Sequence, residues 1–200
     1  MSVIFLFIAV YLLASIPVGL ICSRLVDGSD IRQRGSGNIG ATNVTRVLGR
    51  KWGILVFAVD FLKGFIAPFL VKAFVPEAAV LLYISAAIIA VIGHNWPVFL
   101  KFKGGKGVST SLGAVVALAM IFANFFLVIV VSVLIWNLIY FSTKMVSLAS
   151  LSAALALPIF SFVFKVSWEF KLLTILLFVL VLIRHKSNIT KIINKTEHKF

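Results

Sequence analysis

The sequence predicts an all-α integral membrane protein with seven transmembrane helices. Hydrophobic residues make up 62% of the 200 residues, whereas charged residues make up only 12%. A soluble domain carries about 25% charged residues, so this chain has too few to build a water-exposed surface, and its expected solvent is a lipid bilayer. One transmembrane domain over residues 1–200 is expected, because packed spans leave little chain for a soluble module.

The first three spans are apolar runs near the expected length of about 20 residues. The run Ser2–Cys22 lacks the basic start and the small-residue cleavage site of a signal peptide, so it is interpreted as a retained span. The second span is expected from Trp52 to Val75 and the third from Ala78 to Gly93. The N-terminal half of the chain therefore contributes three spans.

The long uncharged run Val108–Phe141 predicts two further spans. As one straight helix it would be about 50 Å long at about 1.5 Å per residue, well beyond the ~30 Å hydrocarbon core. A turn near residues 122–124 is therefore expected, with a short helix before it. The sixth span is expected from Met145 to Phe164 and the seventh from Trp168 to Ile183.

The positions of the basic residues favour an outside N-terminus and a cytoplasmic C-terminus. In that orientation only Lys72, Lys165 and Lys171 lie outside and Lys63 lies within a span, while the other lysines and arginines face the cytoplasm. The net charge of +13 raises the question of nucleic acid. However, the basic residues stand between apolar spans, so lipid head groups and anionic substrates explain them better, and no nucleic-acid partner is expected.

The first polar segment of the cytoplasmic side is RQRGSGNIGATNVTRVLGRK, from Arg32 to Lys51. Short hydrogen-bonding side chains are offered by Ser36, Asn38, Thr42 and Asn43. Arg46 adds a planar guanidinium suited to phosphate oxygens. An ordinary cytoplasmic loop held by lipid head groups is the alternative.

The second polar segment, Gly93–Ser111, surrounds one lysine with glycines, in the order Gly104, Gly105, Lys106 and Gly107. Ser109 and Thr110 follow at the expected start of a helix, whose backbone N–H groups favour anions. The segment is not a nucleotide-binding Walker A loop, because Leu100 and Gly107 stand where that motif needs a glycine and a hydroxyl residue. The segment predicts a phosphate site, and a flexible basic turn is the alternative.

The third polar segment, Arg184–Phe200, follows the last span and contains His185, a candidate for proton transfer because histidine titrates near neutral pH. A lone histidine at the membrane interface is more often structural, and His94 shares this ambiguity. Asp60 and Lys63, one helical turn apart inside a span, are either a buried scaffolding pair or part of a site. Ser147 and Ser150 either line the site or bond to the helix backbone.

The sequence argues against a nucleophilic cysteine, a metal site and a cofactor. The single cysteine, Cys22, stands at a span end without a nearby histidine, and the six acidic residues are scattered, so neither a conventional nucleophile nor a metal is expected. No cofactor is expected either. Cations, hydroxyls, amides and histidines suit phosphate binding and oxyanion stabilisation.

Three stretches, SGNIGATNVTR (36–46), GHNWPVFLKFKGGKGVST (93–110) and RHKSNI (184–189), closely resemble the signature segments of the bacterial membrane acyl-phosphate:glycerol-3-phosphate acyltransferases. The resemblance implies a seven-span fold in the bacterial cytoplasmic (inner) membrane with its site facing the cytoplasm. The implied reaction moves a fatty acyl group from acyl phosphate to the 1-hydroxyl of glycerol 3-phosphate, giving lysophosphatidic acid and phosphate, the first acylation of phospholipid synthesis. A functional link to the enzyme that makes acyl phosphate is also implied.

The resemblance also assigns roles to residues. Catalytic roles are implied for His185, Asn188 and Ser36; substrate or phosphate binding is implied for Asn38, Thr42, Arg46, Gly104, Gly105, Lys106, Gly107, Thr110 and Ser147. Either His185 accepts the proton of the attacking hydroxyl, with Asn188 orienting groups, or a substrate phosphate takes that proton and His185 only positions it.

One departure from the family pattern and one alternative function stand beside the resemblance. The chain departs from the family pattern near its C-terminus, where Lys195 occupies a glycine place although Glu197 is retained, so the local turn there is in doubt. The alternative function is a transporter of organic anions or lipid phosphates. That function would need polar residues leading to the outer side, whereas the polar segments all lie on one side.

Overall fold

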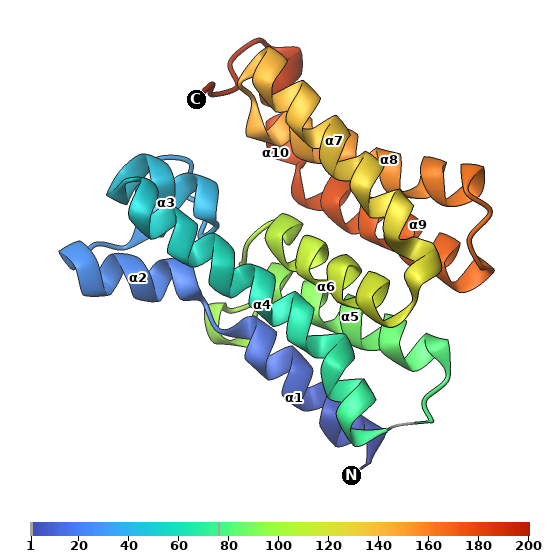
Figure 1. Cartoon of the computed structure of the whole chain (residues 1–200). Helices are drawn as coiled ribbons and strands as arrows, with labels where there is room; N and C mark the ends of the chain where they lie inside the picture. The colour runs from blue at the N-terminus through green and yellow to red at the C-terminus, as the bar shows by residue number, and fades with distance from the viewer. Residues whose placement is uncertain (1, 76) are drawn as a thin grey trace. The chain divides into compact units, whose positions relative to one another are not determined.

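Helices form all the regular secondary structure in residues 2–75 and 77–200, the residues described by the computed structural model (Figure 1). The prediction of an all-α chain is confirmed there. The chain divides into two compact units, residues 1–117 and 118–200, and each is described by itself. The prediction of a single domain over residues 1–200 stays a prediction.

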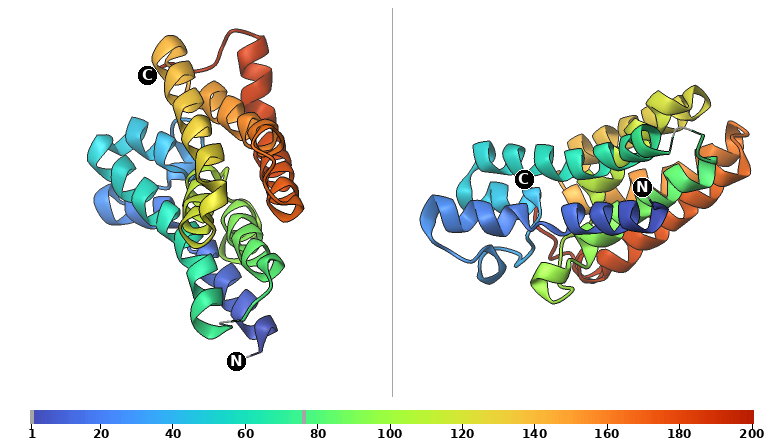
Figure 2. Two further views of the ribbon diagram at one scale, coloured as in Figure 1. Left: turned by 45° about the vertical axis from the view of Figure 1, so that its right-hand side comes forward. Right: turned by 90° about the horizontal axis from the view of Figure 1, so that it is seen from below.

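Unit 1, residues 1–117, is a bundle in which α4 contacts α1, α2, α3 and α5, and α1 also packs along α5 (Figures 1 and 2). Its elements are α1 (Val3–Ser15), α2 (Val18–Asp27), η1 (Ile31–Gln33), α3 (Ala41–Leu48), α4 (Arg50–Phe74), α5 (Val80–Asn95), η2 (Val98–Leu100) and the first part of α6 (Val108–Ile121). Helix α4 thus organises this unit.

The first apolar run differs from the prediction, because two helices replace the single span Ser2–Cys22. The break lies at Ile16 and Pro17, since proline has no N–H to donate and disfavours helical backbone in the residue before it. Helix α2 then continues to Asp27 and ends at Gly28, whose φ of 74° is the left-handed conformation common after helix ends. The helical part therefore ends at Asp27, further along the chain than the predicted span end at Cys22.

Helix α6 packs on α4 at backbone contact distance. A Cβ atom on Gly64 would collide with the carbonyl oxygen of Thr110, and one on Gly113 would collide with the carbonyl oxygen of Phe61. Small residues allow this approach in membrane proteins, where dispersion contacts hold helices together. The start of α6, and the loop before it, are thereby fixed against α4.

Unit 2, residues 118–200, places α8 alongside both α7 and α9 (Figures 1 and 2). Its elements are the end of α6, η3 (Ala123–Phe125), α7 (Phe126–Thr143), α8 (Val146–Val163), α9 (Trp168–Arg184) and α10 (Lys186–Ile193). The turn expected near residues 122–124 is confirmed, since α6 ends at Ile121. Phe125 is fully buried there and stacks on Phe170 with ring centroids 4.7 Å apart.

Five apolar segments in the described residues are long enough to cross a membrane: Val3–Asp27, α4, Val80–Leu100, α7 and α8. A sixth span results if α9 and α10, which meet at a bend of 65°, are taken together. Helix α6, with 14 residues, is shorter than a full span. Large side chains such as Phe5 and Leu138 are more than half exposed, as expected where helices face lipid tails. The chain is therefore an integral membrane protein.

Adding one methyl group at the α4–α6 contact should destabilise unit 1. Gly113→Ala would press its Cβ into the backbone at Phe61 and Phe65, an overpacking that costs about 1–3 kcal/mol. Thermal unfolding of the purified protein in detergent should show a lower midpoint. Val116→Ile adds one methyl at a partly exposed position of the same helix and serves as control. Equal midpoints for the two variants would contradict the close packing.

Candidate functional site

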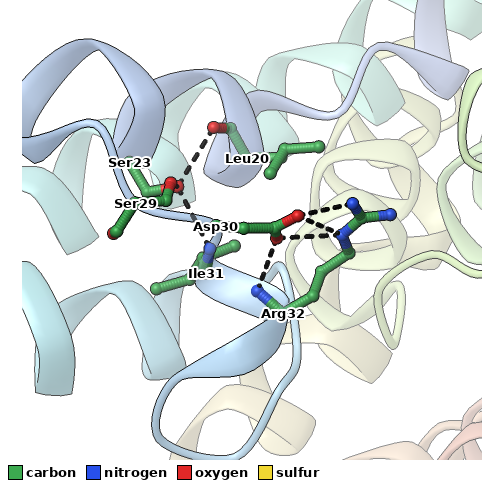
Figure 3. A network of polar contacts seen from close by, with 6 residues as sticks. All are labelled: Leu20, Ser23, Ser29, Asp30, Ile31 and Arg32. Atoms are coloured by element: carbon green, nitrogen blue, oxygen red, sulfur yellow. Dashed lines mark hydrogen bonds and ion pairs between the residues drawn. The ribbon is translucent and has the colours of Figure 1, made fainter.

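The connection between α2 and α3 is held by a small network of polar contacts (Figure 3). Ser23 Oγ lies 2.9 Å from the carbonyl oxygen of Ser29 and accepts a hydrogen bond from the backbone N–H of Ile31. The Arg32 side chain and backbone N–H both donate to the carboxylate of Asp30. These hydrogen bonds hold the pKa of Asp30 at about 2, below its ordinary 3.8. The connection is therefore ordered by its own polar groups.

Asn43 organises the segment that contains Ser36 and Asn38. Its side chain is buried, donates to the backbone carbonyls of Ile31, Arg34 and Asn38, and accepts a hydrogen bond from the N–H of Ser36 at 2.8 Å. This network was missed from the sequence, where Asn43 stood only among several short polar residues. Its one signal is a polar residue on the buried face of a short helix.

The predicted loop Arg32–Lys51 contains a helix, α3, which was not expected. Thr42 and Arg46 stand four residues apart on α3 and therefore share one face of it. Ser36 is exposed in the turn just before the helix, and Asn38 accepts a hydrogen bond from the N–H of Gly40. Ser36 and Asn38 thus lie just before α3, Thr42 lies in its first turn and Arg46 in its last turn.

The first and second polar segments share one hydrophobic core cluster. Ile39 and Val44 of the first segment pack together with Leu100 of η2. Ile31, just before that segment, belongs to the same cluster, and Trp52 of α4 packs against it. Apolar contact of this kind is the main force that buries a loop. The cluster therefore ties the turn before α3 to the turn before α6.

The glycines of the second segment lie packed against the end of α5. The N–H of Gly104 donates to the carbonyl of Asn95 (3.2 Å) and the N–H of Gly105 donates to the carbonyl of His94 (3.1 Å). Gly104, Gly105 and Gly107 are buried, and Lys106 between them is half-buried. Because two of the amides already donate to carbonyls, they shape the loop, and Lys106 is the group most suited to an anion.

Several buried polar atoms beside this loop have no hydrogen-bond partner among the described residues. They are both polar atoms of the Asn95 side chain, Thr110 Oγ1 and Ser111 Oγ. A Cβ atom on Gly107, whose φ is 74°, would collide with the side-chain amide of Asn95. Unsatisfied buried groups cost about 1–3 kcal/mol each, so the start of α6 suits a polar ligand or water.

His185 lies at the junction of α9 and α10 in unit 2 and is 2% exposed. Its Nδ1 lies 2.8 Å from the carbonyl oxygen of Val181. Since a carbonyl only accepts, Nδ1 carries the proton of this bond, and Nε2 is the basic nitrogen of the neutral ring. The geometry therefore suits an acceptor of protons at Nε2.

Asn188 and Glu197 pair one turn further on. The amide of Asn188 donates to Glu197 Oε1 at 2.9 Å. The turn that was in doubt is formed, with Lys195 at a φ of 58° and the N–H of Thr196 bonded to the carbonyl of Lys191. The C-terminal tail thus orients Asn188.

The two serines of α8 differ. Ser150 donates to the carbonyl of Val146 and accepts from the indole N–H of Trp136. Of the two alternatives from the sequence, Ser150 therefore follows the one in which the serine bonds to the helix backbone. Ser147 is buried, and its hydroxyl has no partner among the described residues. Ser147 therefore remains the site candidate of this helix.

Asp60 and Lys63 form the pair that their spacing predicts, 2.8 Å apart in α4. The Nδ1 atom of His94 lies 3.5 Å from the same Asp60 oxygen. This third member stands on α5, and its contact with Asp60 was not predicted from the sequence. Among the described residues, no three His, Cys, Asp or Glu side chains gather as they would around a metal ion.

An apolar cavity of about 270 Å³ lies between α1 and α4. Its lining includes Leu13, Ile16, Leu62 and Ile66, with Lys63 as the charged member. It contains none of the residues predicted for the site.

Comparison with known proteins gives one consistent result. The family model described as glycerol-3-phosphate acyltransferase matches residues 4–195. The glycerol-3-phosphate acyltransferase of Aquifex aeolicus (strain VF5) is 43% identical over 201 residues, covering 100% of both chains. That of Bacillus subtilis (strain 168) is 41% identical over 202 residues, covering 100% of this chain and 98% of its own.

Two solved structures share the fold. They are PlsY, an integral membrane glycerol 3-phosphate acyltransferase, in a glycerol 3-phosphate form and a lysophosphatidic acid form. The first has a TM-score of 0.89 at 42% identity and the second a TM-score of 0.86 at 41% identity. Each alignment covers 100% of this chain and 96% of the other.

The Asp30–Arg32 pair should make stability depend on acid pH. Because the folded pKa of Asp30, about 2, lies below its ordinary 3.8, the pair contributes fully above about pH 5 and is lost progressively as the pH falls through 2. Asp30→Asn should therefore unfold at a lower temperature than the wild type at pH 7, and most of the gap should have closed at pH 2. A gap of constant size across this range would contradict the role of the carboxylate.

Lys195→Gly should stabilise the C-terminal turn. A side chain in left-handed backbone costs about 1–2 kcal/mol, which glycine avoids while adding some chain entropy. A net gain of about 0.5–1 kcal/mol is expected, measured by thermal unfolding. Lys191→Gly, inside α10, is the control and should destabilise instead. A loss of stability in Lys195→Gly would show that the side chain itself is needed.

Proposed function

The chain belongs to the glycerol-3-phosphate acyltransferase family, and we propose that it transfers a fatty acyl group from acyl phosphate to the 1-hydroxyl of glycerol 3-phosphate. The products are lysophosphatidic acid and inorganic phosphate. One observation carries the proposal: the same fold, at over 40% identity, is solved in a glycerol 3-phosphate form and a lysophosphatidic acid form. These two compounds stand before and after a single acylation.

The reaction needs little from the protein beyond positioning and proton transfer. The hydroxyl oxygen attacks the acyl carbon, the bond between that carbon and the phosphate oxygen breaks, and phosphate leaves. An acyl phosphate is already an activated anhydride, so no covalent acyl-enzyme is required. The hydroxyl proton must be accepted, and the developing oxyanion must be stabilised.

Both substrates carry a phosphate, so we infer two neighbouring anion sites. Arg46 can bind phosphate through two N–H groups, and Lys106 offers a compact positive charge. Ser36, Asn38 and Thr42, close to Arg46 around α3, would complete its surroundings. Gly107 would contact substrate together with the Thr110 and Ser147 hydroxyls, which have no partner in the part of the chain that the structure describes, while Gly104 and Gly105 shape the loop.

We propose His185 and Asn188 as the groups nearest the proton transfer. The bond from His185 Nδ1 to the Val181 carbonyl fixes the ring and leaves Nε2 as its basic nitrogen. Asn188, oriented by Glu197, would hold the attacking group or the oxyanion. The alternative, in which a substrate phosphate takes the proton, keeps His185 in a positioning role.

We also propose the finer topology: seven spans, an outside N-terminus, and a site that faces the cytoplasm of a bacterium. The distribution of lysine and arginine supports it. Helix α6 would be a short span, and α10 would lie at the interface after the seventh. The donor must come from an enzyme that makes acyl phosphate, so we propose a functional link to it.

The activity is tested with detergent-purified protein, palmitoyl phosphate and glycerol 3-phosphate. Lysophosphatidic acid and phosphate should form in equal amounts. Lys106→Ala and His185→Ala should each lower the rate by at least about 100-fold, which is the usual contribution of a group acting on the reaction. Lys103→Ala, an exposed lysine of the same loop, is the matched control and should keep its activity.

Three outcomes would contradict the proposal. A wild-type protein that forms no lysophosphatidic acid would rule out the enzyme, and activity with acyl-CoA alone would rule out the donor. Unchanged rates in folded His185→Ala and Lys106→Ala proteins would remove these residues from the site.

A further inference from the structure

A buried carboxylate, Asp60, stands in the middle of α4 with its side chain only 4% exposed. A charge inside a membrane protein is costly and is usually paired or lines a functional cavity. Lys63 Nζ donates to Asp60 Oδ1 at 2.8 Å and also to the carbonyl oxygen of Ile16 at the break between α1 and α2. The pair thus joins two elements of unit 1.

His94 joins this pair to a third element. Its ring is buried at the C-terminal end of α5, and its Nδ1 lies 3.5 Å from the Asp60 oxygen that Lys63 contacts. A buried ring that faces a carboxylate on one side has little freedom to rotate. Asp60 therefore sets the orientation of His94.

The opposite edge of the same ring touches the loop that carries Lys106. A Cβ atom on Gly105 would collide with His94 Nε2 and would lie 2.9 Å from ring atoms Cδ2 and Cε1. The N–H of Gly105 also donates to the His94 backbone carbonyl. His94 therefore contacts the loop twice, with its ring packed against Gly105 and with its backbone carbonyl accepting a hydrogen bond from Gly105.

We propose that Asp60, acting through His94, is a positioning residue that holds the Gly104–Gly107 loop and hence Lys106 in place for substrate phosphate. The inference rests on the proposed role of Lys106. It assigns Asp60 and Lys63 to the site rather than to scaffolding alone. A purely scaffolding pair would affect stability, whereas a positioning pair changes the affinity for a phosphate substrate.

The first test is Asp60→Asn, which removes the charge and keeps the size of the side chain. The KM for at least one of the two phosphate substrates should rise about tenfold or more, with a smaller change in kcat. Stabilisation of the protein by glycerol 3-phosphate or inorganic phosphate in thermal unfolding should weaken in parallel. A folded variant with wild-type KM for both substrates would overturn the proposal.

The matched control is Ser15→Ala. Ser15 is also buried, and it donates to the carbonyl of Gly93, the residue before His94, without reaching the ring. Its KM values should stay within about twofold of wild type. An equal rise in KM for Ser15→Ala would mean that any loosening of the end of α5 has this effect, and would overturn the specific role of Asp60.

A second test leaves Asp60 intact and serves if Asp60→Asn fails to fold. Gly105→Ala should raise KM about tenfold or more because its methyl group meets the His94 ring. His94→Asn keeps a nitrogen near the Nδ1 position but vacates the Nε2 position. The double variant should therefore have a lower KM than Gly105→Ala, and strictly additive effects would overturn the contact.

These experiments separate the inference from the proposed function. If the wild-type protein forms no lysophosphatidic acid, the function itself fails. If the wild type is active and the variants keep their KM values, the function stands and the positioning role fails.

Discussion

One pair of opposite charges inside the membrane, Asp60 and Lys63, supports the arrangement of unit 1. A lone charge there would be expensive, so each member needs the other and the groups around them. Through these contacts the pair meets the broken first span at Ile16 and the end of α5 at His94. Removing one partner would leave the other as an uncompensated buried charge, so the polar end of the bundle depends on both.

The glycines before α6 serve close packing more than freedom of movement. Gly104 lies against Pro97, Gly105 lies against His94, and Gly107 lies against Asn95, each at a distance that a side chain would fill. A loop already held in one shape loses little entropy when it binds an anion. The same residues that make the sequence look flexible therefore make a preorganised loop around Lys106.

Much of the fold could be predicted from sequence because bilayer thickness limits helix length. The turn after Ile121 followed from a run too long for one span, whereas the break at Pro17 was missed because it interrupts a run of acceptable length. Helix α3 was missed because its composition is polar. The three signature segments predicted the residues of the candidate site. The contact of His94 with Asp60 joins residues on different helices, so it could be found only from the packing in the structure.

Asn95, Thr110 and Ser111 carry polar atoms that have no partner among the described residues, and this has a consequence for how an amphiphile can approach α6. A hydrocarbon tail placed there would leave an amide and two hydroxyls without water or partners, whereas a charged head group would satisfy them. Entry head-first is thus favoured and entry tail-first is penalised. At this end of α6, polarity alone therefore favours a charged head group over a hydrocarbon tail.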